Sequence, residues 1–235
     1  MIPWLPDHPC FPPVSTALDD PSGLLAAGGE LTSDWLLAAY RRGIFPWYSE
    51  GQPLLWWSPD PRLVLYPGEV RVSRSLRRVL QKRVFEIRLD TAFDAVLAAC
   101  AAPRPGASGT WITDEMQRAY SMMHQLGYAH SVEAWRDGEL VGGLYGLALG
   151  KVFFGESMFS RVSDASKVCL VHLARFLEAR NFGMIDCQMT TAHLLSLGAR
   201  EIPRSEFCVH LEQWVGDAPE PGRWPAAGAE GFFKG

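Results

Sequence analysis

The stretch from residue 130 to residue 188 constrains the fold most, because its hydrophobic pattern changes period there. Residues 130–135 alternate between apolar and polar positions, Asp137-Gly138 is a pair typical of tight hairpin turns, and two more strand-like stretches follow at 140–149 and 152–159. Three consecutive strands are therefore predicted, each paired with the one before it.

A strand-helix-strand unit is predicted around the end of this meander. Asp164 stands where an N-cap is expected, apolar residues recur at helical spacing as far as Arg180, and Gly183 precedes a short apolar strand at 184–188. A meander that leads into such a unit is typical of a mixed sheet with helices packed on it. The fold class predicted from the sequence is α+β.

The first 61 residues have a different character. Turn signals and aromatic residues are frequent at 18–57, and one helix is predicted at 33–42, with Ser33 as its cap and Gly43 as its stop. The run SPDP at 58–61 is typical of a linker. We therefore expect a small N-terminal domain with its linker at 1–61 and a larger domain at 62–235.

Further elements follow from the same periodicities. They are a strand at 63–65, helices at 72–83, 91–100, 113–126 and 191–197, and a tail without regular structure from Val215. Thr113 is the expected cap of the helix at 113–126, and Gly127 is its stop.

The composition indicates a folded globular chain, with 48% hydrophobic and 20% charged residues. The charge-free stretch at 140–150 is shorter than the roughly 20 apolar residues that a membrane-spanning helix needs. Prolines interrupt the first 13 residues repeatedly, which does not fit a signal peptide. We therefore expect a cytoplasmic protein with no membrane span.

The five cysteines are widely and irregularly spaced. They form no C-x-x-C pair and have no histidine at ligand spacing, apart from the incidental proximity of His8 and Cys10. Neither a disulfide framework nor a metal site is predicted.

Basic residues cluster on one face of the predicted helix at 72–83, although the net charge of the chain is −4. Arg74, Arg78 and Lys82 repeat at a spacing of four, and Arg77 and Arg83 lie beside them. Like charges at this spacing destabilise a helix, so the face is either a solvated surface that tolerates the repulsion or a site for phosphates. The sequence favours neither alternative.

Aromatic residues gather near turn signals. Trp47, Trp56, Trp57 and Trp111 are all expected in loops or beside Gly and Pro. Burial is the better prediction for any single tryptophan. Together with a basic helix face, however, several loop aromatics favour the binding of unpaired RNA ends, whose bases stack on aromatic rings.

Polar side chains interrupt two apolar strands. Asp186 and Gln188 occupy alternate positions of one strand and should point the same way, and Glu156 lies within the apolar run VFFGESMF. A buried carboxylate is costly unless it is paired, so a structural ion pair remains an alternative to a reaction site. Ser157 is a poor nucleophile candidate, because GESMF lacks the final glycine of a nucleophile elbow.

Three glycines at a spacing of four, Gly142, Gly146 and Gly150, lie in the middle of the predicted meander. The segment is too short and too strand-like for a membrane helix interface. We expect these glycines to let another part of the chain or a ligand come close to a strand.

Several long runs of the sequence resemble one known family. In order between about Phe11 and Trp214, they are GLLAAGGELTSDWLLAAYRRGIFPWY, WWSPDPR, GTWIT, HSVEAW, LVGGLYG, GESMFS, IDCQ and HLLSLGAREIPR. In these runs the chain is similar to leucyl/phenylalanyl-tRNA-protein transferases. The resemblance implies transfer of Leu or Phe from aminoacyl-tRNA to the α-amine of proteins that begin with Arg or Lys, which marks them for degradation under the N-end rule. It also implies a catalytic domain similar to acetyltransferases of the GNAT type.

The resemblance also implies roles for individual residues. Trp47 and Trp111 would hold the terminal adenosine, with Tyr120 beside them. The apolar pocket for the aminoacyl side chain would be formed by Leu144, Phe153, Met158, Leu173 and Ile185. The polar reaction centre would contain Glu156, Asp186 and Gln188. The helix that begins after Ser73 would contact the acceptor stem through Arg74, Arg77, Arg78, Lys82 and Arg83. Some members carry Asn in place of Thr191 and Met in place of Leu144.

The chemistry of such a transfer needs no cofactor, because an aminoacyl ester is already activated and orientation supplies much of the barrier reduction. At pH 7 only about a tenth of an α-amine with a pKa near 8 is neutral, so a nearby carboxylate is useful. We expect Gln188 to orient the amine or carbonyl, Asp186 to give electrostatic support or accept a proton through Gln188, and Glu156 to meet the cationic residue or ammonium. A monomer is expected.

Two other functions remain open from the residues alone. An acyl-CoA-dependent N-acyltransferase would need a glycine-rich pyrophosphate loop, and the corresponding run RVSDAS has no glycine. A non-catalytic RNA-binding module would not require Glu156, Asp186 and Gln188 together.

Overall fold

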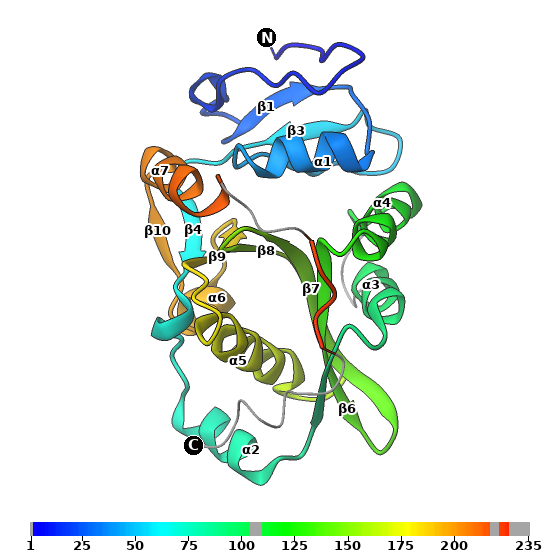
Figure 1. Ribbon diagram of the computed structural model, residues 1–235, viewed down its shortest axis with the longest axis vertical. Coiled ribbons are helices and arrows are strands. Elements are labelled where there is room, and N and C mark those ends of the chain that lie inside the picture. The colour runs from blue at the N-terminus through cyan, green and yellow to red at the C-terminus, as the bar shows by residue number, and fades with distance from the viewer. Residues whose placement is uncertain (1, 104–109, 217–220, 226–235) are drawn as a thin grey trace.

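The computed structural model describes residues 2–103, 110–216 and 221–225, which fold into two stacked parts (Figure 1). The smaller, N-terminal part contains a three-stranded antiparallel sheet in the order β1-β3-β2. Its elements are the 3-10 turn η1 (Val14–Thr16), β1 (Leu24–Ala27), α1 (Ser33–Tyr40), β2 (Phe45–Pro46) and β3 (Leu55–Trp57). The expected helix at 33–42 is confirmed, although its N-cap is Thr32.

The larger part is built on a seven-stranded mixed sheet in the order β10-β4-β9-β8-β7-β6-β5. Its strands are β4 (Arg62–Leu65), β5 (Glu86–Leu89), β6 (Ala129–Arg136), β7 (Glu139–Leu149), β8 (Val152–Ser160), β9 (Met184–Gln188) and β10 (Arg200–Ile202). Neighbouring strands are antiparallel except β8 and β9, which are parallel. The predicted meander and the α+β class are thus confirmed.

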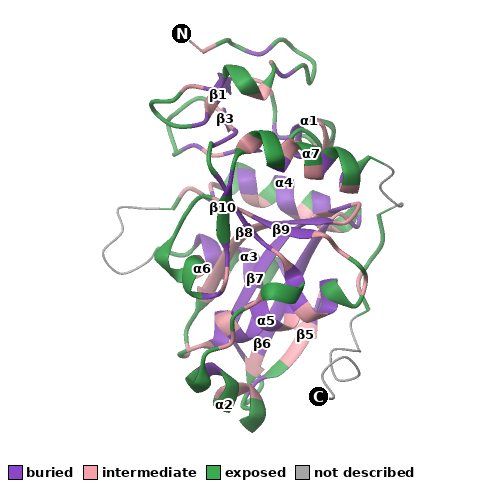
Figure 2. Cartoon of the chain, turned by 90° about the vertical axis from the view of Figure 1, so that its left-hand side faces the viewer, coloured by how far each residue is buried: buried purple, intermediate pink, exposed green. Residues whose placement is uncertain are grey.

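Helices cover both faces of this sheet (Figure 1). Helices α3 (Phe93–Ala101) and α4 (Asp114–Gln125) pack on β6 and β7 from one side, and α5 (Ala165–Glu178) packs on them from the other. The remaining elements are η2 (Pro67–Glu69), α2 (Arg74–Lys82), α6 (Ala192–Ser196) and α7 (Arg204–Val215). Figure 2 shows the strands buried at the centre and α2 exposed at one end.

The core consists of two hydrophobic clusters, one on each face of the large sheet. Strand alternation separates them: Phe154 packs with the N-terminal part, its ring 5.1 Å from that of Tyr40, whereas Phe153 belongs to the cluster under α5. The first cluster extends from Leu5 to Val215 and joins both parts of the molecule.

Several details differ from the sequence predictions. Asp164 precedes α5, but its backbone is left-handed (φ 66°) and its side chain does not cap the helix; it pairs with Lys167, and Ser160 Oγ accepts from Ser166 N instead. The short strands β1, β2, β3, β5 and β10 and helix α7 were not predicted. Strands of two to four residues are too short to show a clear period.

The three spaced glycines do permit close approaches, as predicted. A Cβ at Gly142 would lie 2.5 Å from that of Ala165, and one at Gly146 would lie 2.6 Å from the Phe153 ring. Gly150 has a left-handed backbone (φ 56°) and packs against the carbonyl of Trp214.

The helices at 191–197 and 113–126 are also confirmed, and Thr191 and Thr113 cap them through their hydroxyls. Within the described ranges no helix combines the length and the apolar character that crossing a bilayer requires. Most of the tail expected to be irregular lies outside the described residues, but 221–225 form neither helix nor strand.

Candidate functional site

The large sheet opens at its centre, between β8 and β9. The parallel ladder pairs residues 152–154 with 184–186 and ends there. Residues 155–159 of β8 are only partly buried, although β8 is an internal strand with a neighbour on each side, and Gln188 at the end of β9 is partly buried too. The two strands therefore leave an opening inside the sheet rather than at its edge.

A β-bulge on β8 orients the side chains around this opening. The register with β7 shifts between Tyr145, which faces Ser157, and Gly146, which faces Gly155, so Glu156 has no partner of its own. An extra residue in one strand re-aims the side chains that follow it. Glu156 points with Phe154 toward the N-terminal part, as ordinary alternation requires, whereas Met158, which follows the bulge, lies on the α5 side opposite Leu144.

Three side chains meet at Glu156, and together the four residues form what we call the polar cluster: Tyr40, Tyr120, Glu156 and Gln188. The hydroxyl of Tyr40 donates to Glu156 Oε1 (2.7 Å), and that of Tyr120 donates to Oε2 (2.8 Å). The two hydroxyls are 2.6 Å apart, and Gln188 Nε2 donates to Glu156 Oε1 across the opening (3.3 Å). The cluster thus joins α1 of the N-terminal part with α4, β8 and β9.

The surroundings of Glu156 shift its proton affinity. Burial raises the pKa of Glu156 to about 7, with a further upward contribution from Asp186, while the hydrogen bonds from Tyr40 and Tyr120 and the charge of Arg62 lower it. Burial also raises the pKa values of Tyr40 and Tyr120 well above their usual range, so both remain protonated donors. The carboxyl group can therefore gain or lose a proton near neutral pH.

Asp186 is held by a buried ion pair behind the polar cluster. Arg62 Nε and Nη2 donate to its two carboxylate oxygens at 2.8 and 2.7 Å, and both side chains are fully buried. Arg62 also donates to the carbonyl of Gly43, with the rings of Phe45 and Phe207 at 5.0 and 4.5 Å from the guanidinium carbon. The ion pair that the sequence left open as an alternative is present.

The ion pair also positions Gln188. Asp186 Oδ1 accepts from the backbone N–H of Gln188 at 3.0 Å, and Gln188 has a left-handed backbone (φ 54°). Asp186 therefore contacts the backbone of Gln188, and the amide side chain of Gln188 extends to Glu156 instead. The side chains of Asp186 and Gln188 lie on one face of the sheet, as the alternation in β9 predicted, and Glu156 of β8 meets Gln188 on the same face.

The apolar residues implied by the resemblance lie together on the opposite face. Leu144, Phe153, Leu173 and Ile185 are buried in the cluster under α5, and Met158 packs against it. Leu144 faces Met158 across β7 and β8, and Phe153 faces Ile185 across β8 and β9. We call these five residues the apolar wall. The opening in the sheet lies between the apolar wall and the polar cluster.

Trp47 and Trp111 are half-buried, at the margin of the other core cluster. Trp47 follows β2 with its ring edge-on to Trp57, and Trp111 precedes α4. Their neighbours join the two segments, because the hydroxyl of Tyr48 lies 3.2 Å from Thr113 Oγ1. Tyr120, expected beside these tryptophans, is fully buried and bonded within the polar cluster.

Two of the four tryptophans expected in loops or beside Gly and Pro lie within a strand instead. Trp56 and Trp57 belong to β3, and Trp56 is fully buried, stacks on Trp35 at 6.1 Å and donates to the carbonyl of Gly28. Its burial follows from pairing of β3 with β1, which brings the ring into the core of the N-terminal part.

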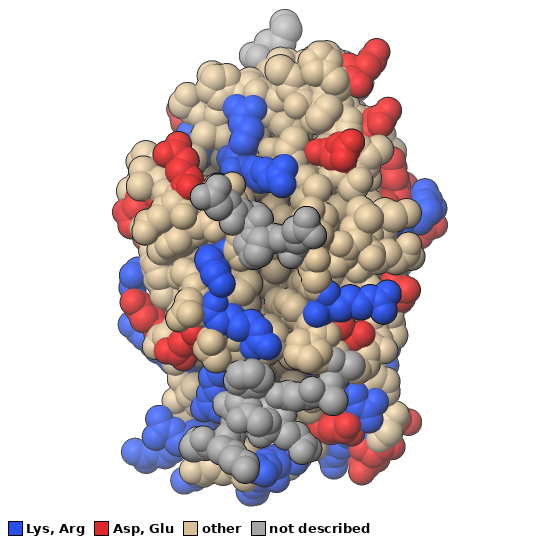
Figure 3. All heavy atoms as spheres, in the orientation of Figure 1, with Lys and Arg blue, Asp and Glu red and all other residues tan. Residues whose placement is uncertain are grey.

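Helix α2 presents the predicted basic face. Arg74, Arg77, Arg78, Lys82 and Arg83 are all exposed. Over residues 2–103, 110–216 and 221–225, none of these five forms an ion pair within the chain. The opposite face packs on the core through Leu76, and Ser73 caps the helix. Figure 3 shows Lys and Arg side chains gathered at the end of the molecule where α2 lies.

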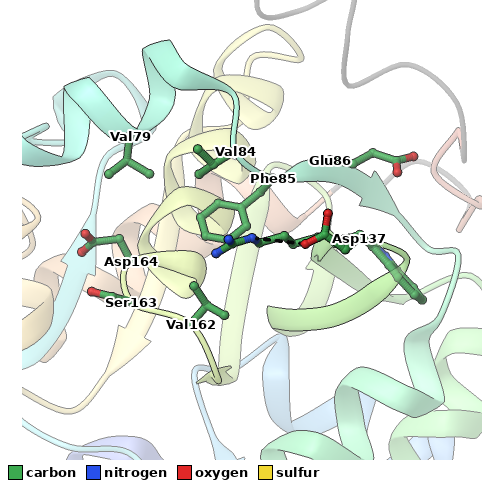
Figure 4. Close-up of a pocket in the computed structure, with 10 residues that line it drawn as sticks. Val79, Val84, Phe85, Glu86, Asp137, Val162, Ser163 and Asp164 are labelled. Carbon is green, nitrogen blue, oxygen red and sulfur yellow. Dashed lines mark ion pairs between the residues drawn. The ribbon is translucent and has the colours of Figure 1, made fainter.

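A separate surface cleft of about 560 Å³ lies between α2, the start of β5, the β6–β7 hairpin and the loop before α5 (Figure 4). It is lined by Val79, Val84, Phe85, Glu86, Trp135, Arg136, Asp137, Val162, Ser163 and Asp164. It shares no residue with the polar cluster or the apolar wall.

Sequence reasoning missed Tyr40 and Arg62. Nothing around Tyr40 distinguishes it from a core residue of an amphipathic helix. Arg62 had a weak signal, because a lone arginine beginning the apolar run RLVL is the cation that a buried carboxylate such as Asp186 requires.

Comparisons with known proteins find matches over most of the chain. The family model described as leucyl/phenylalanyl-tRNA protein transferase matches residues 64–212, and that of its N-terminal domain matches residues 29–60. The leucyl/phenylalanyl-tRNA–protein transferase of Azoarcus sp. (strain BH72) is 68% identical over 232 residues, covering 99% of each chain. That of Nitrosospira multiformis is 60% identical over 224 residues, covering 95% of this chain and 97% of its own.

Similarity to solved structures is weak. The structure of L-PGS from Bacillus licheniformis aligns with a TM-score of 0.38 and 8% identity, covering 71% of this chain and 53% of its own.

Proposed function

Since the chain belongs to the leucyl/phenylalanyl-tRNA protein transferase family, we propose that the opening between β8 and β9 is the site where the aminoacyl group is transferred. The chain moves Leu or Phe from aminoacyl-tRNA to the α-amine of proteins with N-terminal Arg or Lys, and so marks them for degradation. The opening itself supports this location for the transfer, because a titratable polar cluster lies on one face of the sheet there and an apolar wall lies on the other.

The two faces suit the two halves of an aminoacyl ester. The Leu or Phe side chain lies against the apolar wall, where burial of apolar surface contributes about 25 cal/mol per Å². The ester carbonyl and the attacking amine lie at the opening, beside Glu156 and Gln188. The terminal adenosine stacks on Trp47 and Trp111, and the phosphates of the acceptor stem contact the basic face of α2.

Glu156 accepts a proton from the attacking amine. The incoming α-ammonium gives one proton to the Glu156 carboxylate, and the neutral nitrogen attacks the ester carbonyl carbon. The new C–N bond replaces the C–O bond to the ribose, and a second proton passes from the nitrogen to the departing ribose oxygen. A carboxyl group with a pKa of about 7 is well matched to an amine with a pKa near 8.

Gln188 and Asp186 have different parts in this reaction. Gln188 contacts the substrate and orients the amine or carbonyl by hydrogen bonding. Asp186 is a positioning residue, because Arg62 binds both of its oxygens and Oδ1 also accepts from the backbone N–H of Gln188. Its electrostatic support reaches the reaction through Gln188 and through the pKa of Glu156.

The wider assignments follow from the same reaction. No cofactor is required, because the ester is already activated, and a tRNA substrate places the reaction in the cytoplasm. We propose that the protein acts as a monomer, with a domain boundary at 61/62. The GNAT-type assignment of the larger domain is supported by the parallel β8–β9 pair, its connecting helix α5 and the separation of the two strands.

The test follows labelled Leu from Leu-tRNA to a peptide that begins with Arg, with labelled acetyl-CoA in a parallel reaction. We expect transfer only from tRNA. Glu156→Gln, which keeps the size of the side chain, should reduce the rate by about 10²–10⁴-fold while leaving binding of a non-hydrolysable aminoacyl-adenosine analogue within a fewfold of wild type. Wild-type transfer by Glu156→Gln would contradict the assigned site.

A further inference from the structure

One glycine near the opening, Gly155, is not required by crowding. In β7, glycines are required by crowding, because a Cβ at Gly142, Gly143 or Gly146 would lie 3.0 Å or less from a neighbouring atom. At Gly155 in β8, the nearest atoms to a Cβ would be the carbonyl oxygen of Asp186 at 3.5 Å and Ile185 Cγ2 at 4.0 Å, which are ordinary contacts. A methyl group at Gly155 would therefore fit against these atoms without a collision.

Backbone conformation does not explain Gly155 either. Gly155 does not have a left-handed φ, so its backbone conformation does not require glycine. Glycine inside a strand costs conformational entropy and contributes no packing. The β-bulge that begins here does not require glycine either, because the glycine form of a bulge has that residue left-handed. Close approach of a ligand is then the remaining reason for a glycine inside the strand.

Gly155 lies between the polar cluster and the apolar wall, so the ligand expected there is the aminoacyl group. It directly follows the last paired residue of the β8–β9 ladder, Phe154, and precedes Glu156 of the polar cluster. Ile185, a member of the apolar wall, borders the place that a Cβ at Gly155 would take, and Gly155 is only partly buried although its strand is internal. A molecule that reaches from Glu156 to the apolar wall must pass this residue.

We propose that Gly155 is a specificity-determining residue, which keeps the passage between the polar cluster and the apolar wall wide enough for the side chain of the transferred amino acid. The inference rests on the proposed location of aminoacyl transfer. A methyl group at this position fits the empty protein but occupies space that the substrate needs. The side chain of Phe is larger than that of Leu, so the added methyl group should hinder binding of Phe more than binding of Leu.

The test compares Gly155→Ala with the wild-type full chain, using Leu-tRNA and Phe-tRNA with the same Arg-initiated peptide. One methyl group in an apolar pocket changes kcat/KM by roughly 10–200-fold. We expect kcat/KM to fall by at least about tenfold with Phe-tRNA and by less with Leu-tRNA, so that the Leu-to-Phe ratio rises. The Tm should stay the same or rise, and affinity for deacylated tRNA should not change.

Two results would overturn the inference. One is wild-type kcat/KM with both tRNAs; the other is a lower Tm with normal activity in the folded fraction, which would make Gly155 a structural requirement of the sheet. Gly146→Ala is the matched control, because the added methyl would collide with the Phe153 ring and should lower the Tm.

A further variant separates this inference from the site it rests on. Ile185→Val removes one methyl from the apolar wall, and we expect it to alter the Leu-to-Phe ratio. If Gly155→Ala alone leaves the ratio unchanged, only the role of Gly155 is wrong. If both variants leave it unchanged, the apolar wall does not hold the side chain and the proposed location fails.

Discussion

At the scale of single residues, the environment of each carboxylate decides its chemistry. Glu156 and Asp186 lie on the same face of the sheet, yet Asp186 is bound by a guanidinium, whereas Glu156 receives hydrogen bonds from neutral tyrosine hydroxyls and a neutral amide. Burial raises the pKa of Glu156 to about 7, so this carboxyl group can titrate near neutral pH. The two acids therefore differ in their partners, since the oxygens of Asp186 are occupied by Arg62 and those of Glu156 by neutral groups.

Glu156 predicts a pH dependence of both rate and stability. Its folded pKa of about 7 lies above the usual carboxyl value of 4.5, so the folded state binds the proton more tightly than the unfolded state. The wild-type free energy of unfolding should therefore fall as pH rises from about 4.5 to about 7, and Glu156→Gln should lose this dependence. The rate of transfer should also depend on Glu156.

In the wild type the rate should rise as pH passes through 7, and in Glu156→Gln this rise should be absent. Both proteins are measured with the same peptide, so that the titration of its α-amine affects both rate profiles equally. Identical pH–rate profiles for the two proteins would contradict the assignment of Glu156.

Replacing Asp186 is expected to destabilise the folded protein. Asp186→Asn leaves the buried Arg62 without its partner, which should cost about 3–5 kcal/mol in the free energy of unfolding. Replacing the pair together, as Arg62→Met with Asp186→Leu, should recover much of the stability. It should not recover transfer, because the backbone N–H of Gln188 still lacks its acceptor. Urea unfolding and single-turnover transfer measure the two effects, and full activity in the double variant would show that Asp186 does not position Gln188.

At the scale of elements, α2 shows how one helix divides its faces between packing and binding. Leu76 packs on the core while the basic residues face solvent, unpaired by any acid within the described ranges. Strand β8 divides its faces differently, because the bulge at Glu156 shifts the alternation half-way along the strand. A polar cluster and an apolar wall can thus share one strand.

The basic face of α2 predicts the salt dependence of tRNA binding. Replacing Arg74, Arg78 and Lys82 with alanine should flatten the slope of log K against log salt by roughly 0.7–0.9 for each phosphate that the helix no longer neutralises. Binding titrations with deacylated tRNA at several salt concentrations measure the slope. Arg88→Ala is the control, because Glu86 already neutralises Arg88. An unchanged slope in the triple variant would leave α2 as a solvated surface.

At the scale of the whole molecule, the N-terminal part completes the site. Tyr40 comes from α1 and donates to a carboxylate 116 residues away, and the guanidinium of Arg62 reaches back to Gly43. One hydrophobic cluster continues through both parts. The N-terminal part therefore contributes one of the side chains of the polar cluster, Tyr40.

Tyr40 predicts that the N-terminal part tunes the reaction. Its hydrogen bond lowers the pKa of Glu156, so Tyr40→Phe should raise that pKa and move the midpoint of the rate profile to higher pH. Tyr48→Phe is a matched control, because the Tyr48 hydroxyl bonds Thr113 and Glu115 instead. The pH dependence of single-turnover transfer gives both midpoints; identical shifts in the two variants would mean that the effect is not specific to Glu156.

Features that depend on neighbours along the chain could be predicted from the amino-acid order. The meander, the helical faces of α2 and α5, and the common orientation of Asp186 and Gln188 all follow from periods of two and about 3.6 residues, which are local properties. The resemblance then supplied the family and the residues of the apolar wall. Three features emerged only in the folded chain: Arg62 pairs with Asp186 across 124 residues, Tyr40 joins Glu156, and β8 bulges at Glu156. These depend on which strands become neighbours, and local periodicity carries no information about that choice.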